Sequence, residues 1–138
     1  MALMDWGPVL QVGYRDIDDQ HMRLVELVNE LDDAMRVGKA HDMLEHVLTE
    51  LVNYTVFHFA FEEELMDRYQ VSSTETHKAE HRQLVADVAD FATAVRAGTG
   101  TVSTDLMAFL RDWLGTHILK TDKALAKELL ARGARSVA

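Results

Sequence analysis

Five of the seven histidines fall at helical spacing within apolar stretches of the chain. They are His21, His58, His77, His81 and His117. Burying an imidazole without a partner costs a few kcal/mol, and five such residues would consume much of a domain's stability of about 5–15 kcal/mol. A bound metal removes this cost because each ring nitrogen becomes a ligand. The pattern therefore predicts a metal site inside the fold.

Acidic residues stand close to these histidines in the sequence. Glu62 follows His58 by four residues, and His81 follows His77 by the same spacing. Side chains four residues apart share one face of a helix, so each pair can reach one metal ion or two adjacent ions.

Asp122 follows His117 by five residues, which is a less obvious spacing. On a regular helix these two side chains would point about 140° apart. Either they reach the site from two edges of the helix, or the helix contains an i+5 turn, as functional sites often do. Taken alone, Asp122 beside Lys120 and Lys123 would equally suit a solvated surface charge.

Five imidazoles and two carboxylates are too many ligands for one ion. A tetrahedral zinc ion needs only four ligands, and calcium or magnesium would take oxygen ligands instead of imidazoles. Two six-coordinate ions fit if both carboxylates and an oxide or hydroxide bridge them, and one position then stays vacant. Mixed imidazole and carboxylate ligands suit iron, with manganese, cobalt or zinc as substitutes.

Four stretches with helical periodicity carry these side chains. They run from about Asp19 to Val37, from Ala40 to Tyr69, from Ser73 to just before Gly98, and from just after Ser103 to near Gly133. The single proline lies among the first eighteen residues, so nothing interrupts the helices. With short connections and no strand-like alternation, the predicted fold is all-α, an antiparallel up-down-up-down four-helix bundle.

Cap residues support these helix ends. Gly38 is placed to end the first helix as a left-handed cap. Ser72 and Glu75 have the spacing of a capping box at the start of the third helix, and Ser103 suits the N-cap of the fourth.

Residues 1–138 are predicted to form one domain. It consists of a bundle over residues 19–133 and an N-terminal arm over residues 1–18, which lies against the bundle with Trp6 as its anchor. His41 and His46 drift out of phase with the apolar stripe and are expected at the surface.

The composition excludes several classes of function. The net charge of −9 is a poor match for nucleic acid. The absence of cysteine excludes disulfides, thiolate metal sites and iron–sulfur clusters. No stretch approaches the roughly 18 apolar residues of a membrane span, and no signal peptide is visible, so a cytoplasmic location is expected.

Four motifs follow one another in a specific order, each on its own predicted helix. They are Ile17-Asp18-Asp19-Gln20-His21, preceded by Trp6 and Val12-Gly13; Tyr54 to Met66, with His58 and Glu62; His77-Lys78-Ala79-Glu80-His81; and Trp113-Leu114-Gly115-Thr116-His117, followed by Asp122. From Trp6 to about Leu130 the chain resembles the hemerythrin family, in particular its single-domain bacterial members. One departure is the loop Gln70–Ser73, where family members often have a proline.

The resemblance implies a non-haem di-iron protein with two iron ions per chain and a bridging oxide or hydroxide. One iron would be held by His77, His81 and His117. The second iron, which keeps the vacant position, would be held by His21 and His58. Glu62 and Asp122 would bridge the two irons.

Apolar residues near the ligands are candidates to line an O2 pocket. Leu114 and Trp113 precede His117 by three and four residues, and Phe57 and Phe61 are further candidates. The alternative is that these are ordinary core residues, since packing and pocket lining are compatible. Tyr54, one turn before His58, could bond a ligand or merely pack, and packing is expected.

The leading hypothesis is reversible O2 binding without catalysis, by a monomer that stores O2 or delivers it to an O2-consuming enzyme. The first alternative is a sensor module for O2, nitric oxide or redox state. The second is a di-iron enzyme that acts on peroxide, nitric oxide or iron. The third is a structural bundle with incidental metal. No interaction with nucleic acid or insertion into a membrane is expected.

Overall fold

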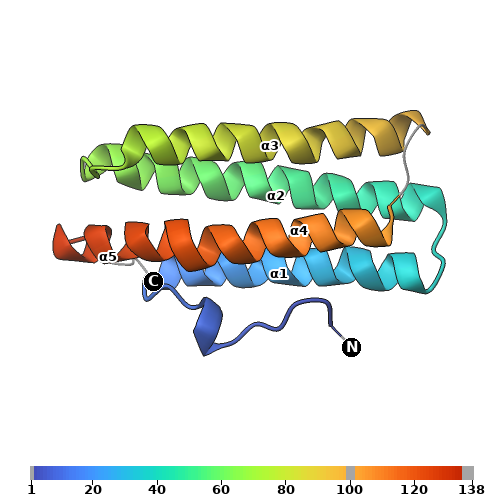
Figure 1. The fold of residues 1–138 in the computed structure, drawn as a ribbon, viewed down its shortest axis with the longest axis horizontal. Coiled ribbons are helices and arrows are strands. Elements are labelled where there is room, and N and C mark those ends of the chain that lie inside the picture. Colours follow the sequence, from blue (N-terminus) through green and yellow to red (C-terminus); the bar gives the residue numbers. More distant parts are fainter. Residues whose placement is uncertain (1, 99–101, 135–138) are drawn as a thin grey trace.

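The computed structural model describes residues 2–98 and 102–134 as a bundle of four helical rods (Figure 1). The last rod consists of three elements that follow one another without a break. The elements are η1 (Pro8–Leu10), α1 (Arg15–Arg36), α2 (His41–Arg68), α3 (Thr74–Ala97), α4 (Thr104–Thr116), the π-helical turn η2 (His117–Asp122) and α5 (Lys123–Ala131). The predicted all-α four-helix bundle is confirmed.

The rods pack in the order that short connections impose. Helix α2 packs against α1 on one side and α3 on the other, and α4 packs against α1. The prediction of one domain over residues 1–138 also covers residue 1, residues 99–101 and residues 135–138, which lie outside the described residues.

The first helix begins four residues earlier than predicted, at Arg15. The Asp18 carboxylate, inside the first turn, accepts hydrogen bonds from the backbone N–H of Val12 at 2.7 Å and of Gly13 at 3.2 Å. This side chain satisfies backbone donors just before the helix, which allows the helix to start upstream of it. The arm is therefore shorter than the predicted residues 1–18.

The predicted caps hold at two helix ends and fail at a third. Gly38 has a φ of 74°, and Lys39 N–H donates to the Ala34 carbonyl at 3.0 Å, as expected for a left-handed cap. Ser103 Oγ accepts from the Leu106 N–H at 3.2 Å, which confirms the fourth N-cap.

The capping box predicted at Ser72 and Glu75 is wrong. Helix α3 begins at Thr74, and its N-cap makes no side-chain hydrogen bond. Instead, the Ser72 N–H and its Oγ both donate to the Glu128 carboxylate at 2.7 Å. A contact with α5 thus takes the hydroxyl that the local pattern assigned to the helix start.

The N-terminal arm lies along the bundle, as predicted (Figure 1). Its firmest attachment is Met4, whose backbone N–H and carbonyl both bond to the Asn29 side chain, at 2.9 and 2.8 Å. Met4 and Leu10 are buried, whereas Trp6 packs against the core but is only half-buried. Trp6 is therefore one contact of the arm and not its main anchor.

The apolar core divides into two clusters along the bundle axis. The larger contains Leu24 to Leu31 of α1 and residues facing them from α2, α3 and α4. The smaller contains Ile17, Leu65 and Leu125 with their neighbours at the other end. On three rods a predicted metal-ligating residue lies between the two clusters in the sequence, so polar side chains mark the level at which the clusters meet. They are His21, between Ile17 and Leu24; Glu62, between Phe59 and Leu65; and Asp122, between Ile118 and Leu125.

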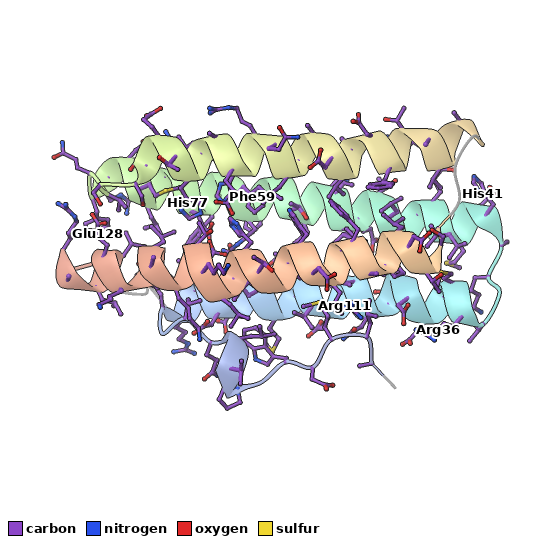
Figure 2. All side chains as sticks on the ribbon, in the orientation of Figure 1. Arg36, His41, Phe59, His77, Arg111 and Glu128 are labelled. Atoms are coloured by element: carbon purple, nitrogen blue, oxygen red, sulfur yellow. The ribbon has the colours of Figure 1, made fainter. Side chains whose placement is uncertain are left out.

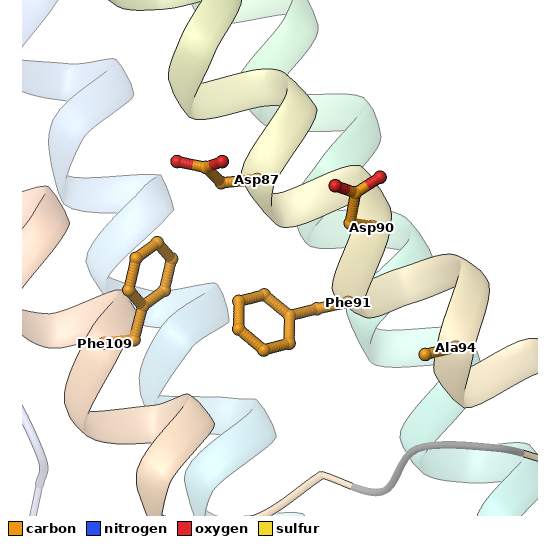
Figure 3. Close-up of a pocket in the computed structure, with 5 residues that line it drawn as sticks. All are labelled: Asp87, Asp90, Phe91, Ala94 and Phe109. Carbon is orange, nitrogen blue, oxygen red and sulfur yellow. The ribbon is translucent and has the colours of Figure 1, made fainter.

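A surface hollow of about 530 Å³ lies between α3 and α4 (Figure 3). Phe91 and Phe109 line it from opposite sides, with ring centroids 5.3 Å apart. Asp87 and Asp90 stand at its edge. None of the predicted ligands lines this hollow, so it is separate from them.

The outer surface carries the remaining two histidines, as predicted. His41 and His46 are exposed, and His46 Nε2 lies 3.2 Å from the Glu50 carboxylate on the next turn of α2. Among the described residues, no helix combines the length and the apolar character that crossing a bilayer requires.

Candidate metal centre

Seven polar side chains from all four rods meet in the layer between the two apolar clusters. Each is at most 3% exposed. They are His21 of α1, His58 and Glu62 of α2, His77 and His81 of α3, and His117 and Asp122 of η2. Figure 2 shows His77 in the interior, between the rods. The structure thus brings together every residue that the sequence proposed as a ligand.

The potential ligand atoms form two sets, and the atoms of each set lie within 4.8 Å of one another. Both sets contain the carboxylates Glu62 and Asp122, and they differ in their imidazoles. One set has His77, His81 and His117, and the other has His21 and His58. The arrangement therefore has two centres that share their acidic groups.

Glu62 presents one oxygen to each set. Its Oε1 lies 3.1 Å from His81 Nε2 and 3.6 Å from His77 Nε2. Its Oε2 lies 3.1 Å from His58 Nε2 and 3.6 Å from His21 Nε2. A carboxylate in this orientation can bridge two cations, one through each oxygen.

Asp122 is oriented in the same way. Its Oδ1 lies 3.1 Å from His117 Nε2 and 3.2 Å from His77 Nε2, whereas its Oδ2 lies 2.9 Å from His21 Nε2. The π-helical turn His117–Asp122 produces this placement, because a wider turn returns residues five apart to one face. Of the two arrangements that the spacing left open, the structure contains the i+5 turn.

The inward-facing atoms of the cluster lack hydrogen-bond partners. The Nε2 atoms of all five imidazoles and both oxygens of Glu62 and of Asp122 are buried, and none makes a well-aligned hydrogen bond to a described residue. Leaving a buried polar atom unsatisfied costs about 1–3 kcal/mol. Bound cations would satisfy all these atoms at once, so the donor set fits a pair of metal ions.

Three imidazoles are oriented from outside the cluster through their Nδ1 atoms. The partners, with distances, are Gln20 Oε1 for His58 at 2.7 Å, Glu63 Oε2 for His81 at 2.9 Å and Glu80 Oε1 for His117 at 2.6 Å. Nδ1–H donates to these oxygens, which leaves the Nε2 lone pair free to face a metal ion. Among the described residues, Nδ1 of His21 and of His77 has no such partner.

Adjacency in the sequence is only a partial signal for these outer partners. Each of them is adjacent in the chain to a predicted ligand: Gln20 precedes His21, Glu63 follows Glu62, and Glu80 precedes His81. Yet each bonds an imidazole on a different helix, a pairing that adjacency along one helix cannot reveal.

The charges of the cluster shift the pKa values of its members. Burial alone would lower the pKa of His21, but the Asp122 and Glu62 carboxylates outweigh burial and raise it to about 9. The pKa of His117 also rises to about 9, against burial and mainly because of Asp122. Without metal, protons on these imidazoles therefore balance the carboxylates, and an incoming cation must displace them.

The acidic groups shift the other way. Burial alone would raise the pKa of Glu62, but His58, with the other imidazoles around it, holds that pKa well below its usual value. The pKa of Asp122 is also lowered, against burial and the Glu62 charge, by the imidazoles beside it. Glu80 has a lowered pKa because His117 outweighs its partial burial. All three carboxyl groups are thus ionised at neutral pH.

An aromatic residue that the sequence analysis did not select covers one side of the cluster. The Phe59 ring stacks on the His81 imidazole, with centroids 3.7 Å apart and planes at 3°. It also lies 6.3 Å from the Trp113 ring and 5.6 Å from the His117 ring. Leu114 is buried in the same apolar cluster as Phe59 and Trp113. Apolar side chains therefore adjoin the imidazoles on this side.

The other two pocket candidates lie elsewhere. Phe57 is 54% exposed, and its ring contacts Tyr54 5.5 Å away at the α1–α2 surface. Phe61 packs against the smaller apolar cluster, beside Tyr14 and Leu65. The prediction that Phe57 lines an internal pocket is wrong, because its position on α2 turns it outward. Tyr54 packs, as expected.

Comparisons with known proteins show which family the chain resembles. The family model described as hemerythrin HHE cation binding domain matches residues 12–129. Bacteriohemerythrin of Methylococcus capsulatus is 38% identical over 126 residues, 89% of this chain and 94% of that protein. Bacteriohemerythrin of Pseudomonas aeruginosa is 38% identical over 122 residues, 88% and 78% of the two chains. The crystal structure of wild-type hemerythrin matches with a TM-score of 0.88 and 36% identity, over 93% of this chain and 98% of that one.

Proposed function

We infer that this chain, which belongs to the hemerythrin family, is a non-haem di-iron protein that binds O2 reversibly. The observation that carries this function is the orientation of Glu62 and Asp122. Each turns one oxygen toward His77 and a neighbouring imidazole and the other toward His21. Two buried carboxylates placed in this way suit a pair of ions better than a single one.

The proposed ligands divide as the geometry does. His77, His81 and His117 would hold one iron, and His21 and His58 the other, with Glu62 and Asp122 bridging. When bound, a ferrous pair supplies the two electrons that reversible O2 binding draws on. Since one half has three imidazoles and the other two, the half of His21 and His58 would have room for a further ligand. A bridging oxide or hydroxide completes the proposed centre.

The surrounding residues would keep water away from the bound ions. The seven ligands lie between two apolar clusters and are at most 3% exposed. We assign Leu114 to the lining of the O2 pocket, with Trp113 beside it, because both are buried in the larger apolar cluster that adjoins the ligands. Keeping water and protons out prevents loss of reduced oxygen and irreversible oxidation of the irons.

The excess of imidazoles over carboxylates among the ligands favours O2 binding without turnover. Five neutral imidazoles donate less charge than the carboxylate-rich sets of di-iron enzymes, whose Glu and Glu-x-x-His pattern is absent from this sequence. One chain supplies all seven groups, so we expect a monomer. The proposed role is to store O2 in the cytoplasm or to deliver it to an O2-consuming enzyme.

The test is an anaerobic titration of reduced, iron-loaded protein with O2, with iron quantified in the same sample. We expect two irons per chain, uptake of one O2 with new charge-transfer absorption, and release of that O2 under argon. Steady O2 consumption with peroxide in solution would instead support an enzyme. Metal well below two per chain would support a structural bundle.

A further inference from the structure

The hydrogen bonds around the metal centre place negative charge beside only one of its halves. On one side, Nδ1 of His81 and of His117 donates to the carboxylates of Glu63 and Glu80, at 2.9 and 2.6 Å. We call this side the three-histidine half. It is built from His77, His81 and His117.

In the two-histidine half, neither His21 nor His58 has a hydrogen bond from Nδ1 to a carboxylate of the described residues. The only outer partner of its imidazoles among the described residues is the neutral amide oxygen of Gln20, 2.7 Å from His58 Nδ1. The difference between the halves is therefore one of charge as well as of ligand number.

The Glu80 carboxylate is held in place by a further hydrogen-bond donor. Thr121 Oγ1 donates to both oxygens of Glu80, at 3.0 and 3.2 Å. The side chains of Glu63 and Glu80 are 32% and 39% exposed. In the described part of the chain, neither has a Lys or Arg partner within salt-bridge distance. Each thus places a carboxylate directly against its imidazole.

A carboxylate that accepts the Nδ1–H of a ligand imidazole makes its Nε2 a stronger electron donor. An amide oxygen increases the electron donation of Nε2 less, because it carries no negative charge to strengthen the hydrogen bond. We propose that Glu63 and Glu80 make the ion of the three-histidine half the easier of the two to oxidise, so that an outer-sphere oxidant takes its first electron there. One electron passes to the oxidant, no bond forms or breaks, and the Nδ1 protons stay in their hydrogen bonds. The proposal rests on the di-iron centre of the proposed function.

The experiment is an anaerobic spectroelectrochemical titration of iron-loaded protein with ferricyanide as mediator, which resolves two one-electron couples. Glu63→Gln and Glu80→Gln keep a hydrogen-bond acceptor and remove the charge. Each substitution is expected to raise the reduction potential of the lower couple by about 59 mV. This shift corresponds to a tenfold change in the ratio of oxidised to reduced form. Gln20→Glu adds a charge to the two-histidine half and should lower the upper couple. All three changes narrow the gap between the couples.

The control is Glu64→Gln. Glu64 is next to Glu63 on α2, and its replacement removes one negative charge, as Glu63→Gln does. Glu64 is exposed and pairs with Arg68, so its replacement should leave the gap unchanged. Equal shifts of both couples in the Glu63 and Glu80 variants, or no shift, would overturn the proposal. If either Glu63→Gln or Glu80→Gln fails to bind two irons, the potentials of the other variant and of Gln20→Glu test the proposal.

The same samples separate the two claims. A wild-type chain that binds fewer than two irons contradicts the proposed function and needs no potential measurement. If the wild-type chain binds two irons and O2 normally, but the difference between the two potentials is unchanged in all three variants, only the inference about Glu63 and Glu80 is contradicted.

Discussion

His117 Nε2 lies 3.1 Å from Asp122 Oδ1, although the two residues are five positions apart along the chain. A regular α-helix would point these side chains about 140° apart. The π-helical turn over His117–Asp122 resolves this conflict and places both side chains in the buried layer. The fourth rod therefore deviates from α-helical geometry where it supplies two of the seven polar groups.

The shared carboxylates should control the number of ions that the chain holds. Replacing Glu62 with Ala removes the oxygens that face both sets of imidazoles. We expect iron content after anaerobic loading to fall from two ions per chain to one or fewer, and O2 uptake to disappear. Glu64→Gln on the same helix is the matched control, with unchanged iron content. A Glu62→Ala protein with two irons and normal O2 binding would refute the ligand assignment.

Removing Leu114 should affect both stability and O2 binding. Truncation of a buried leucine to alanine typically costs about 2–5 kcal/mol of unfolding free energy, and Leu114 is 2% exposed. If Leu114 also lines the O2 pocket, the variant admits water, and the oxygenated form should autoxidise faster. Urea unfolding and the decay of charge-transfer absorption measure the two effects. Lower stability with an unchanged autoxidation rate would show that Leu114 only packs.

Two phenylalanines two residues apart on α2 should behave differently. Phe59 is 4% exposed and stacks on His81, so Phe59→Ala should cost about 3–5 kcal/mol, as buried aromatic truncations do, and weaken iron retention. Phe57 is 54% exposed, so Phe57→Ala should cost below about 1 kcal/mol and leave iron binding unchanged. Thermal unfolding and chelator competition give both values. Similar losses in the two variants would contradict the outward placement of Phe57.

The metal-free protein should lose stability as pH rises above neutrality. His21 and His117 have pKa values raised from 6.5 to about 9 in the fold. Their contribution is therefore fully present below about pH 6.5 and is lost as pH rises through 9. Glu62 and Asp122 have lowered pKa values, so their contribution is present above their ordinary values of 4.5 and 3.8 and is lost as pH falls.

The expected maximum of metal-free stability thus lies between about pH 4.5 and 6.5. Iron replaces the protons on the imidazoles, so the loaded protein should keep its stability between pH 6.5 and 9. Urea unfolding of both forms across this range measures the difference. A metal-free protein that becomes more stable from pH 6.5 to 9 would contradict these pKa directions.

The bundle and the ligand candidates could be predicted because buried imidazoles at helical spacing violate the usual apolar pattern. His58 and Glu62 stand out on an otherwise apolar face, and a regular period fixes which residues share that face. Helix ends were predictable where the cap was local, as at Gly38 and Ser103.

Features that depend on packing between rods could not be predicted. Phe57 and Phe59 flank His58 on either side, and only the packing of α3 against α2 decides that Phe59 faces His81. The same holds for Ser72, whose hydroxyl bonds to Glu128 of α5 and not to its own helix. Contacts between residues distant in the sequence decide these cases, and no local spacing encodes them.

The most direct measurement is a crystal structure of anaerobically iron-loaded protein, with anomalous data collected at the iron absorption edge. We expect two anomalous peaks, one within bonding distance of His77, His81 and His117 and the other within bonding distance of His21 and His58. Both peaks should be bonded to Glu62 and Asp122. A single peak, or two peaks of which either lacks one of these carboxylates, would contradict the proposed centre.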